Sequence, residues 1–401
     1  MMSTLRVRTH SAWIARFVGC CTAFTLIACV PRMAVAQSGG PDSSPEPASS
    51  GAVPAGGAGE QAQSADAGTL EFFRSTELGG FVDTYYTFYS SKLDAPYRSF
   101  DFEHNQFTPA MAQIWLNKAP SQDSRVGFKT KLNLGSTTPV ISFAEPDNPL
   151  QYVQEAYVSY LAPAGNGLQI DVGKWVTQHG AEVIEAMDNW NYSRSILFGW
   201  AIPFYHSGVR ASYDFNEKVR VGASVSNGWN NVYENNTGKT VGVGLTLTPT
   251  ESVTIMQNYM FGPEQIDNND DIRHLYDATV SYAATPALSL MVNYDYGRDE
   301  LGALDVEWQG IAGYLKYQGN QWAVSPRFEW YDDPDGFSTG TIQTMKETTI
   351  TLELMPTDTF RWRIEYRSDF SDRPVFETDA GELKKSQHSI GFGWIFAFGT
   401  T

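Results

Sequence analysis

The chain has 401 residues, of which 42% are hydrophobic and 18% are charged, and its formal net charge at pH 7 is −17. A mean hydropathy of −0.30 excludes a bundle of transmembrane helices. It does not exclude a membrane β-barrel, because only every second residue of a barrel strand faces lipid. The acidic balance, without a basic cluster anywhere in the sequence, argues against nucleic acid as a partner.

The first 36 residues have the pattern of a secretory signal peptide. Three arginines lead into a mostly apolar stretch at 17–30, and residues 34–36 (Ala-Val-Ala) supply the small residues of a cleavage site. The apolar stretch is too short to span a bilayer as a helix. One alternative stays open: residues 26–29 resemble a lipobox, which would make Cys29 a lipidated N-terminus.

Cleavage after Ala36 would leave a mature chain without cysteine, because all three cysteines lie before that point. It would also remove four arginines and no acid, which takes the formal charge from −17 to −21. Residues 37–77 are rich in Gly, Ala, Ser and Pro, and we expect them to form a disordered periplasmic tail. The folded unit is therefore expected at 78–401.

From residue 78 onward, apolar residues alternate with polar or small ones, which is the pattern of β-strands with one apolar face. In residues 241–247, for example, Val and Leu alternate with Gly and Thr. Sixteen such segments are predicted, at 78–90, 107–118, 124–135, 151–161, 167–177, 206–214, 217–228, 239–248, 251–261, 272–283, 286–297, 307–318, 320–331, 345–355, 358–368 and 386–399.

The connections between these segments alternate between long and short. The long ones begin near residues 91, 136, 178, 229, 262, 298, 332 and 369, and the short ones include 119–123, 162–166, 214–216, 283–286 and 356–358. A transmembrane antiparallel barrel of about sixteen strands has this arrangement, with short periplasmic turns and long extracellular loops. The sheet must close, because an open edge would leave backbone groups unpaired in hydrocarbon. Tyr85, Tyr86 and Tyr89 cluster at one strand end and predict an aromatic girdle at the membrane interface.

If the apolar strand faces point to lipid, the opposite faces carry charges into an aqueous lumen. The basic candidates are Arg125, Lys129, Lys131, Arg210, Arg220, Arg327, Arg361, Arg363 and Arg367. The acidic candidates are Asp83, Glu155, Asp171, Asp277, Asp295, Glu329, Glu347, Glu353 and Glu365. Nine of each sign predict a balanced wall. The last three arginines share one strand face and either bind passing anions or, as we favour, pair with Glu329 or Glu353 on adjacent strands.

The third long connection carries a carboxylate at every third residue, Glu182, Glu185 and Asp188, and Arg194 follows. A short helical turn would place the three carboxylates on one side. One interpretation is a constriction formed by these four residues, facing a wall of basic side chains. The candidates for that wall are Arg210, Arg220, Arg327, Arg361, Arg363 and Arg367. The other interpretation is a packed loop with exposed acids, and the sequence does not decide between them.

Four segments around this connection resemble the OmpL-like β-barrel porin family (porin-2). They are GKWVT at 173–177, GAEVIE at 180–185, NWNYSRS at 189–195 and PFYHSGVR at 203–210. The resemblance covers roughly residues 78–401 and implies an outer-membrane barrel with diffusion-channel activity. The chain continues past Phe398 with Gly-Thr-Thr, whereas outer-membrane barrels often end on an aromatic residue.

The expected function is therefore a porin in the outer membrane of a Gram-negative bacterium. It would pass small hydrophilic solutes or ions passively, without a cofactor or a metal, and a homotrimer is compatible with this expectation. One alternative is a plugged structural or adhesive barrel without transport. A remote one is a barrel hydrolase assembled from His179, His206, Ser193, Ser207 and Asp188, although the sequence has neither a G-x-S-x-G nor an H-E-x-x-H motif.

Overall fold

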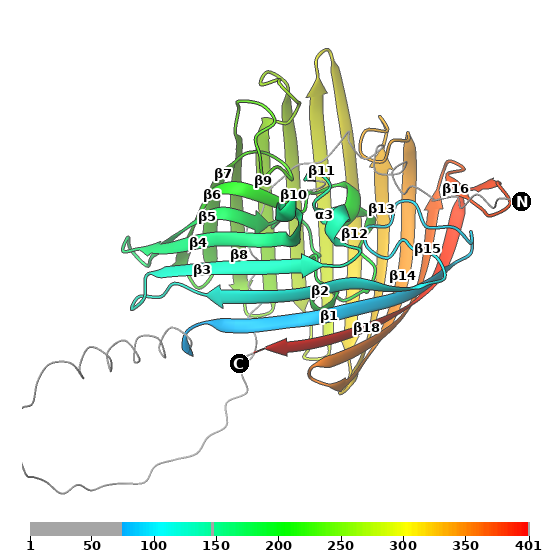
Figure 1. The fold of residues 1–401 in the computed structure, drawn as a ribbon, viewed down its shortest axis with the longest axis horizontal. Helices are drawn as coiled ribbons and strands as arrows, with labels where there is room; N and C mark the ends of the chain where they lie inside the picture. Colours follow the sequence, from blue (N-terminus) through cyan, green and yellow to red (C-terminus); the bar gives the residue numbers. More distant parts are fainter. Residues whose placement is uncertain (1–73, 146–147, 400–401) are drawn as a thin grey trace, which may run out of the picture.

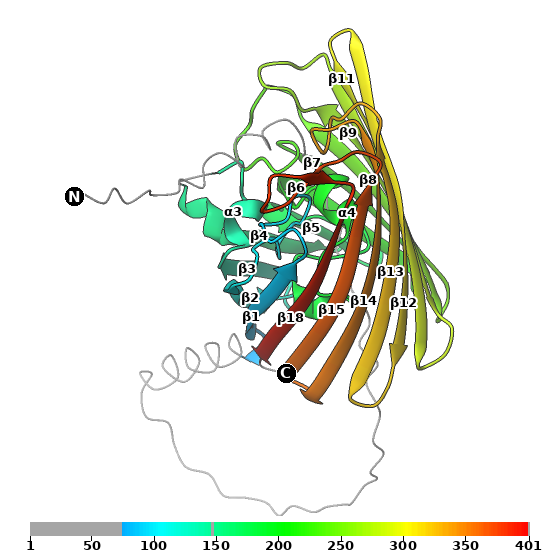
Figure 2. The ribbon, with the colours of Figure 1, turned by 90° about the vertical axis from the view of Figure 1, so that its right-hand side faces the viewer.

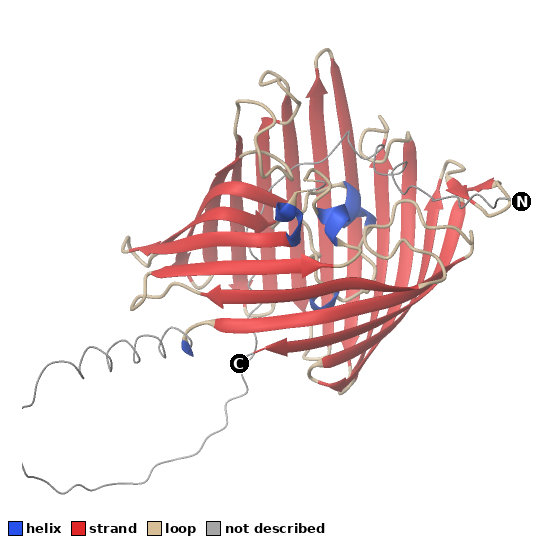
Figure 3. Ribbon diagram, viewed as in Figure 1, coloured by secondary structure: helices blue, strands red, loops and turns tan. Residues whose placement is uncertain are grey.

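The computed structural model describes residues 74–145 and 148–399. The predicted signal peptide at 1–36, the lipidation alternative at Cys29 and the predicted tail up to residue 73 lie outside this part of the chain. The described polypeptide forms one closed antiparallel barrel of sixteen strands and a separate two-stranded hairpin (Figures 1 and 3). The predicted fold class, an all-β antiparallel barrel of about sixteen strands, is confirmed.

Each predicted segment corresponds to one barrel strand. The barrel strands are β1 (Glu77–Tyr89), β2 (Phe107–Lys118), β3 (Val126–Leu134), β4 (Val153–Ala162), β5 (Leu168–Val176), β6 (Tyr205–Asn216), β7 (Val219–Ser226), β8 (Thr240–Thr250), β9 (Val253–Pro263), β10 (Ile272–Ala283), β11 (Leu288–Leu301), β12 (Leu304–Gln318), β13 (Trp322–Asp333), β14 (Gln343–Thr357), β15 (Phe360–Ser371) and β18 (Ser386–Gly399). The hairpin is β16 (Phe376–Glu377) and β17 (Leu383–Lys384). The short helical elements are α3 (Thr138–Ile141), α4 (Ile196–Trp200) and the 3₁₀ turns η1 (Pro149–Tyr152) and η2 (Ala186–Asp188).

The first and last barrel strands close the sheet. β1 pairs with β18 in a continuous antiparallel register that runs from Gly79 opposite Gly399 to Tyr89 opposite Ser389. β18 in turn pairs with β15, so each of the sixteen described barrel strands has two hydrogen-bonded neighbours. The backbone N–H and C=O groups are thereby satisfied within the sheet, which is what a bilayer demands of a membrane-spanning sheet.

Alternating burial follows the period of two along each strand. On β14, Glu347, Thr349 and Glu353 are at most 2% exposed, whereas Ile350 and Leu352 between them are 48% and 37% exposed. The exposed side chains of this kind form an apolar outer face around the barrel, and the buried polar ones face inward. No helix in the described ranges is long and apolar enough to cross a membrane.

The predicted tyrosine girdle on β1 is wrong for two of its three members. Tyr85 and Tyr89 are completely buried, and only Tyr86 alternates to the outer face. Residues four apart on a strand face the same side, and both tyrosines share the side of the buried Phe81 and Asp83. Clustering in sequence therefore did not mean clustering at the membrane interface.

The connections differ between the two ends of the barrel. One end, which we call the turn end, has connections of two to seven residues, at 119–125, 163–167, 217–218, 251–252, 284–287, 319–321 and 358–359. The other, the loop end, has connections at 90–106, 135–152, 177–204, 227–239, 264–271, 302–303, 334–342 and 372–385. The first strand begins and the last strand ends at the turn end (Figure 1).

The prediction of a long connection that begins near residue 298 is wrong. β11 and β12 continue past this point and join through Gly302 and Ala303 alone, with Gly302 at a φ of 66°. These strands stand above their neighbours in Figure 1. The charged residues here favoured a loop in the sequence, but they keep the strand alternation. Asp299 is fully buried, whereas Arg298 is half-buried and pairs with Asp305 at 2.7 Å.

A lysine in place of Ile350 is expected to destabilise the barrel by about 2–4 kcal/mol, because it would bring a charge to the middle of the lipid-facing surface. Equilibrium urea unfolding in phospholipid vesicles measures this loss. The control is Leu383→Lys in β17, an exposed position outside the barrel wall, where we expect a change within about 0.5 kcal/mol. Equal stability of the two variants would contradict a lipid-facing Ile350.

Candidate functional site

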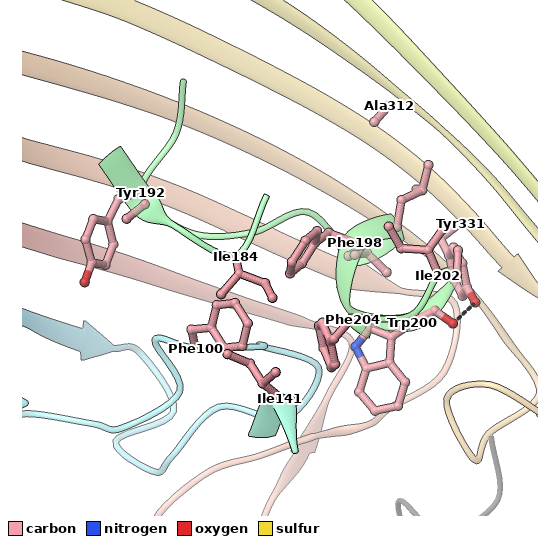
Figure 4. Close-up of a cluster of buried hydrophobic side chains, with 14 of the residues drawn as sticks. Phe100, Ile141, Ile184, Tyr192, Phe198, Trp200, Ile202, Phe204, Ala312 and Tyr331 are labelled. Atoms are coloured by element: carbon pink, nitrogen blue, oxygen red, sulfur yellow. Dashed lines mark hydrogen bonds between the residues drawn. The ribbon is translucent and has the colours of Figure 1, made fainter. Parts of the chain in front are cut away.

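The connection between β5 and β6, residues 177–204, packs against the inner face of the barrel, and we call it the inner loop (Figures 2 and 4). Its contacts reach widely separated strands. The Tyr192 hydroxyl donates to Asp83 on β1 at 2.9 Å. The Gly180 N–H donates to Asp277 on β10 at 2.9 Å, and the Leu197 N–H donates to Glu329 on β13 at 3.2 Å. The loop therefore crosses the lumen.

The three carboxylates of the inner loop do not share one helical face. Only residues 186–188 form a helical turn, η2, so Glu182 and Glu185 precede it in irregular backbone. Their side chains reach opposite parts of the wall, Glu182 toward β13 and Glu185 toward β3. Asp188 is the exposed member of the three. The predicted helical spacing is thus wrong, because Glu182 and Glu185 each extend to a separate cation.

Glu182 is held by Arg327 of β13. Arg327 Nη1 lies 2.7 Å from Glu182 Oε1, and the other carboxylate oxygen accepts the Ser195 N–H at 2.6 Å. The same guanidinium contacts Glu347 at 2.9 Å and Glu329 at 3.3 Å. All these side chains are buried. Removing one partner from such a cluster is costly, because it leaves an uncompensated buried charge.

Glu185 forms the corresponding anchor on the other side of the lumen. Its carboxylate lies 2.7 Å from Lys131 Nζ on β3 and accepts hydrogen bonds from the amides of Gln113 and Gln154 at 3.0 and 2.8 Å. Lys131 also contacts Glu155 at 3.2 Å. Charge-assisted bonds of this kind are stronger than neutral ones, so the loop is fixed at both sides.

The arginines of β15 bind the backbone of the inner loop. Arg363 donates to the carbonyl oxygens of Ala186 and Asn189 at 2.6 Å each and to that of Asn191 at 3.0 Å. Arg367 donates to the Arg194 carbonyl at 2.6 Å. These arginines are at most 1% exposed, so they satisfy loop carbonyls and present no ladder to a passing solute.

The favoured cross-strand pairing of these arginines also occurs, but Glu347 takes the place of Glu329 as one of the partners. Arg363 pairs with Glu353 on β14, Nε to Oε2 at 2.6 Å, and Arg361 lies 3.8 Å from the same carboxylate. Arg367 lies 3.7 Å from Glu347. Glu329, the other proposed partner, contacts Arg327 within its own strand instead.

Arg194 closes the inner loop upon itself. Its guanidinium donates to the carbonyl oxygens of Val183, Tyr192 and Ile184, and it lies over the ring of Phe100 at 5.2 Å. Only 4% of the residue is exposed. As a member of the predicted constriction it therefore shapes the loop, whereas Asp188 is the member in contact with water.

Arg210 and Arg220 lie apart from the inner loop's main anchors. Arg210 pairs with Asp171 at 2.8 Å and stacks over Trp175, with its guanidinium carbon 5.3 Å from the ring. Arg220 pairs with Asp214 near the turn end, where Arg220 is half-buried and Asp214 is exposed. The six arginines proposed as one wall thus occupy three environments.

An apolar cluster joins the inner loop to other connections inside the barrel (Figure 4). Phe198, Trp200 and Ile202 of the inner loop pack with Phe100 from the connection 90–106 and Ile141 of α3. The Tyr331 hydroxyl donates to the Trp200 carbonyl at 3.3 Å, which fixes α4 to β13. Three connections therefore form one packed unit inside the mouth.

Burial separates the two signs of charge on the wall. All nine acidic candidates are buried, whereas Arg125, Lys129, Lys131, Arg220 and Arg361 are only half-buried. The sequence predicted equal numbers of positive and negative side chains on the wall, but the candidates that water reaches are basic. Lys316 on β12, missing from the candidates, is also half-buried. Its alternation with Leu315 and Tyr317 would have assigned it to the inner face.

The residues of the hydrolase alternative have other partners. The Ser193 hydroxyl lies 3.2 Å from Arg327 and 3.4 Å from Arg367, and His206 Nδ1 lies 2.9 Å from the Gly228 carbonyl. Within the described ranges, no group of three or more His, Asp or Glu residues is placed to hold a metal ion.

Solved outer-membrane barrels share this fold. An anion-selective porin from Comamonas acidovorans matches with a TM-score of 0.57 and 11% identity over 81% of this chain and 99% of its own. The outer-membrane channel DcaP of Acinetobacter baumannii matches with a TM-score of 0.54 and 10% identity over 80% and 97%. The trimer form of OmpT, an outer-membrane protein of Vibrio cholerae, gives 0.54 and 11% over 80% and 99%. At these identities the likeness shows the fold alone.

Sequence comparison goes further than the fold. No curated protein matches the sequence. The family model described as "Putative beta-barrel porin-2, OmpL-like" matches residues 75–398, which include all sixteen barrel strands apart from Gly399, the last residue of β18. The chain belongs to the OmpL-like β-barrel porin-2 family.

Proposed function

We propose that this chain is an outer-membrane porin, a passive diffusion channel for small hydrophilic solutes or ions without turnover chemistry. The observation that carries the proposal is a closed sixteen-strand barrel with an apolar outer face, a charged inner face and a long loop folded into its lumen. In the proposed orientation the turn end faces the periplasm. Export by a signal peptide cleaved after Ala36 and assembly as a homotrimer belong to the same proposal.

The inner loop is the proposed constriction. Its support is the pair of anchors that fix it to opposite parts of the wall, Glu182 to Arg327 on β13 and Glu185 to Lys131 on β3. A loop held at both sides narrows the passage reproducibly, and Asp188, exposed between them, meets passing ions. The selectivity of the channel would then depend on this carboxylate and on the half-buried cations near it.

A plugged barrel without transport is the second candidate, and one observation favours it. Wall residues such as Asp83, Arg327 and Arg363 are 2% exposed or less, so the inner loop covers much of the inner face. Coverage on this scale occurs both in a narrow channel and in a plug, and only a conductance measurement separates the two.

Single-channel recording of the mature protein, refolded from detergent into a planar bilayer under a salt gradient, tests the proposal. We expect stepwise, long-lived openings, because the wall is polar and the inner loop is anchored rather than free. A correctly folded barrel that stays silent would reject the channel and favour the plugged barrel.

Replacing Glu182 and Glu185 by Gln and Asp188 by Asn is expected to shift the reversal potential toward anions, since three negative charges leave the inner loop. Asp188→Asn alone is the sharper variant, because Glu182 and Glu185 also hold the loop in place. An unchanged reversal potential in the triple variant would remove this loop from the constriction.

Gly393→Ala on β18 is expected to displace the inner loop, because a Cβ at this position would lie 2.4 Å from the Tyr192 ring. We expect a higher conductance and a loss of about 1–3 kcal/mol in unfolding free energy. Gly391→Ala is the matched control on the same strand face, where the nearest atom, Thr87 Oγ1, is 3.3 Å away. Identical conductance in the two variants would show that the region around Tyr192 does not narrow the passage.

A further inference from the structure

A recess of about 570 Å³ opens at the turn end of the barrel, among the ends of β12, β13, β14 and β15. Its lining is strongly polar. The residues that line it include Gln318, Asn320, Gln321, the exposed Asp358 and Arg361. In ligand pockets, a few polar groups and a charged residue fix the orientation of the ligand and provide specificity.

Three cations surround one carboxylate beside this recess. Glu353 is engaged by Arg363, whose Nε lies 2.6 Å from Oε2. Lys316 Nζ is 3.9 Å from Glu353 Oε1, and Arg361 Nη1 is 3.8 Å from Oε2. Both distances exceed a hydrogen bond. Arg363 compensates the charge of Glu353. In the described chain, neither Lys316 nor Arg361 has another carboxylate within 4 Å.

The two cations also have unused donors. Lys316 Nζ makes no hydrogen bond within the described residues, and Arg361 makes one, from Nη1 to the Met187 carbonyl at 2.7 Å. Their side chains are only 20% and 29% exposed, so water hydrates them incompletely. Partly desolvated cations with free N–H groups gain most from an anion, which supplies both charge and acceptor oxygens.

Two acidic residues lie near Lys316 and Arg361, but neither neutralises these two cations. Asp188 interacts electrostatically with Arg361, and it is itself exposed on the inner loop. Asp358 lies in the two-residue turn after β14 and is exposed, so water screens it. In the described chain, neither carboxylate has an oxygen within 4 Å of a side-chain nitrogen of Lys316 or Arg361.

We propose that this recess binds the carboxylate or phosphate group of a small anionic solute. Arg361 in its wall and Lys316 beside it provide the positive charge, and the amides of Asn320 and Gln321 donate hydrogen bonds. The Gln318 amide already donates to the carbonyl oxygens of Gly319 and Trp322 at 3.0 and 3.2 Å. The inference deepens the proposed channel function and rests on it for the route by which the solute arrives. Binding itself does not require conduction, so the two are tested separately.

Isothermal titration calorimetry of the full barrel folded in detergent tests the site, with citrate and, separately, inorganic phosphate as probes. We expect saturable binding of one anion per chain, and the stronger of the two probes identifies the preferred group. Lys316→Gln and Arg361→Gln should each weaken binding about tenfold, because each removes a charge-assisted hydrogen bond.

Arg125→Gln is the matched control, since Arg125 also lies at the turn end but donates to the Leu161 carbonyl and to Gln122, both at 3.0 Å. It should leave the affinity within about twofold, as expected for a distant charge screened by salt. Lys316→Gln keeps all hydrogen bonds of the inner loop, so a loss of affinity in this variant does not come from a displaced loop.

Two results would overturn the inference: no saturable binding of either anion, or equal affinity in Lys316→Gln and the unmodified protein. A barrel that binds citrate but never conducts would retain the site and reject the channel. A barrel that conducts without binding either anion would retain the proposed channel and reject the anion site.

Discussion

A bilayer offers no hydrogen-bond partner to a backbone, and this constraint determines the rest of the structure. The pairing of β1 with β18 satisfies it by removing both edges of the sheet. Once the sheet is closed, every second side chain must face inward regardless of its chemistry. Residues such as Glu347 and Arg327 therefore enter an interior where a charge without a partner or water would be costly.

The inner loop and the charged wall satisfy each other. An irregular loop inside a barrel has backbone groups without strand partners. Arg363 accommodates three of its carbonyls, and Glu365 accepts the N–H groups of Tyr192 and Ser193 at 2.7 and 3.0 Å. Because these bonds go to the main chain, the wall fixes the path of the loop more directly than it fixes its side chains. The carboxylate of Asp188 is left to face water.

The period of two was sufficient to predict the strands and their inward faces, because side-chain alternation is a property of each strand alone. It did not predict the length of one connection or the position of the inner loop's carboxylates. The turn at Gly302 and Ala303 was missed because charges on a strand outside hydrocarbon read as a loop. The helical spacing of Glu182 and Glu185 was misread because Arg327 and Lys131, far away in sequence, draw the two side chains apart.

Counting charges along the strands also could not give the surface that a solute meets. Alternation assigns a residue to the inner face but does not tell what covers it. Glu155 is fully buried beneath Lys131, 3.2 Å away, and water reaches the lysine first. Since a Coulomb interaction weakens with distance and with the intervening solvent, a solute at contact range responds to the outer charge more than to the buried one. Selectivity in such a lumen therefore depends on the order in which opposite charges are stacked, even when their numbers are equal.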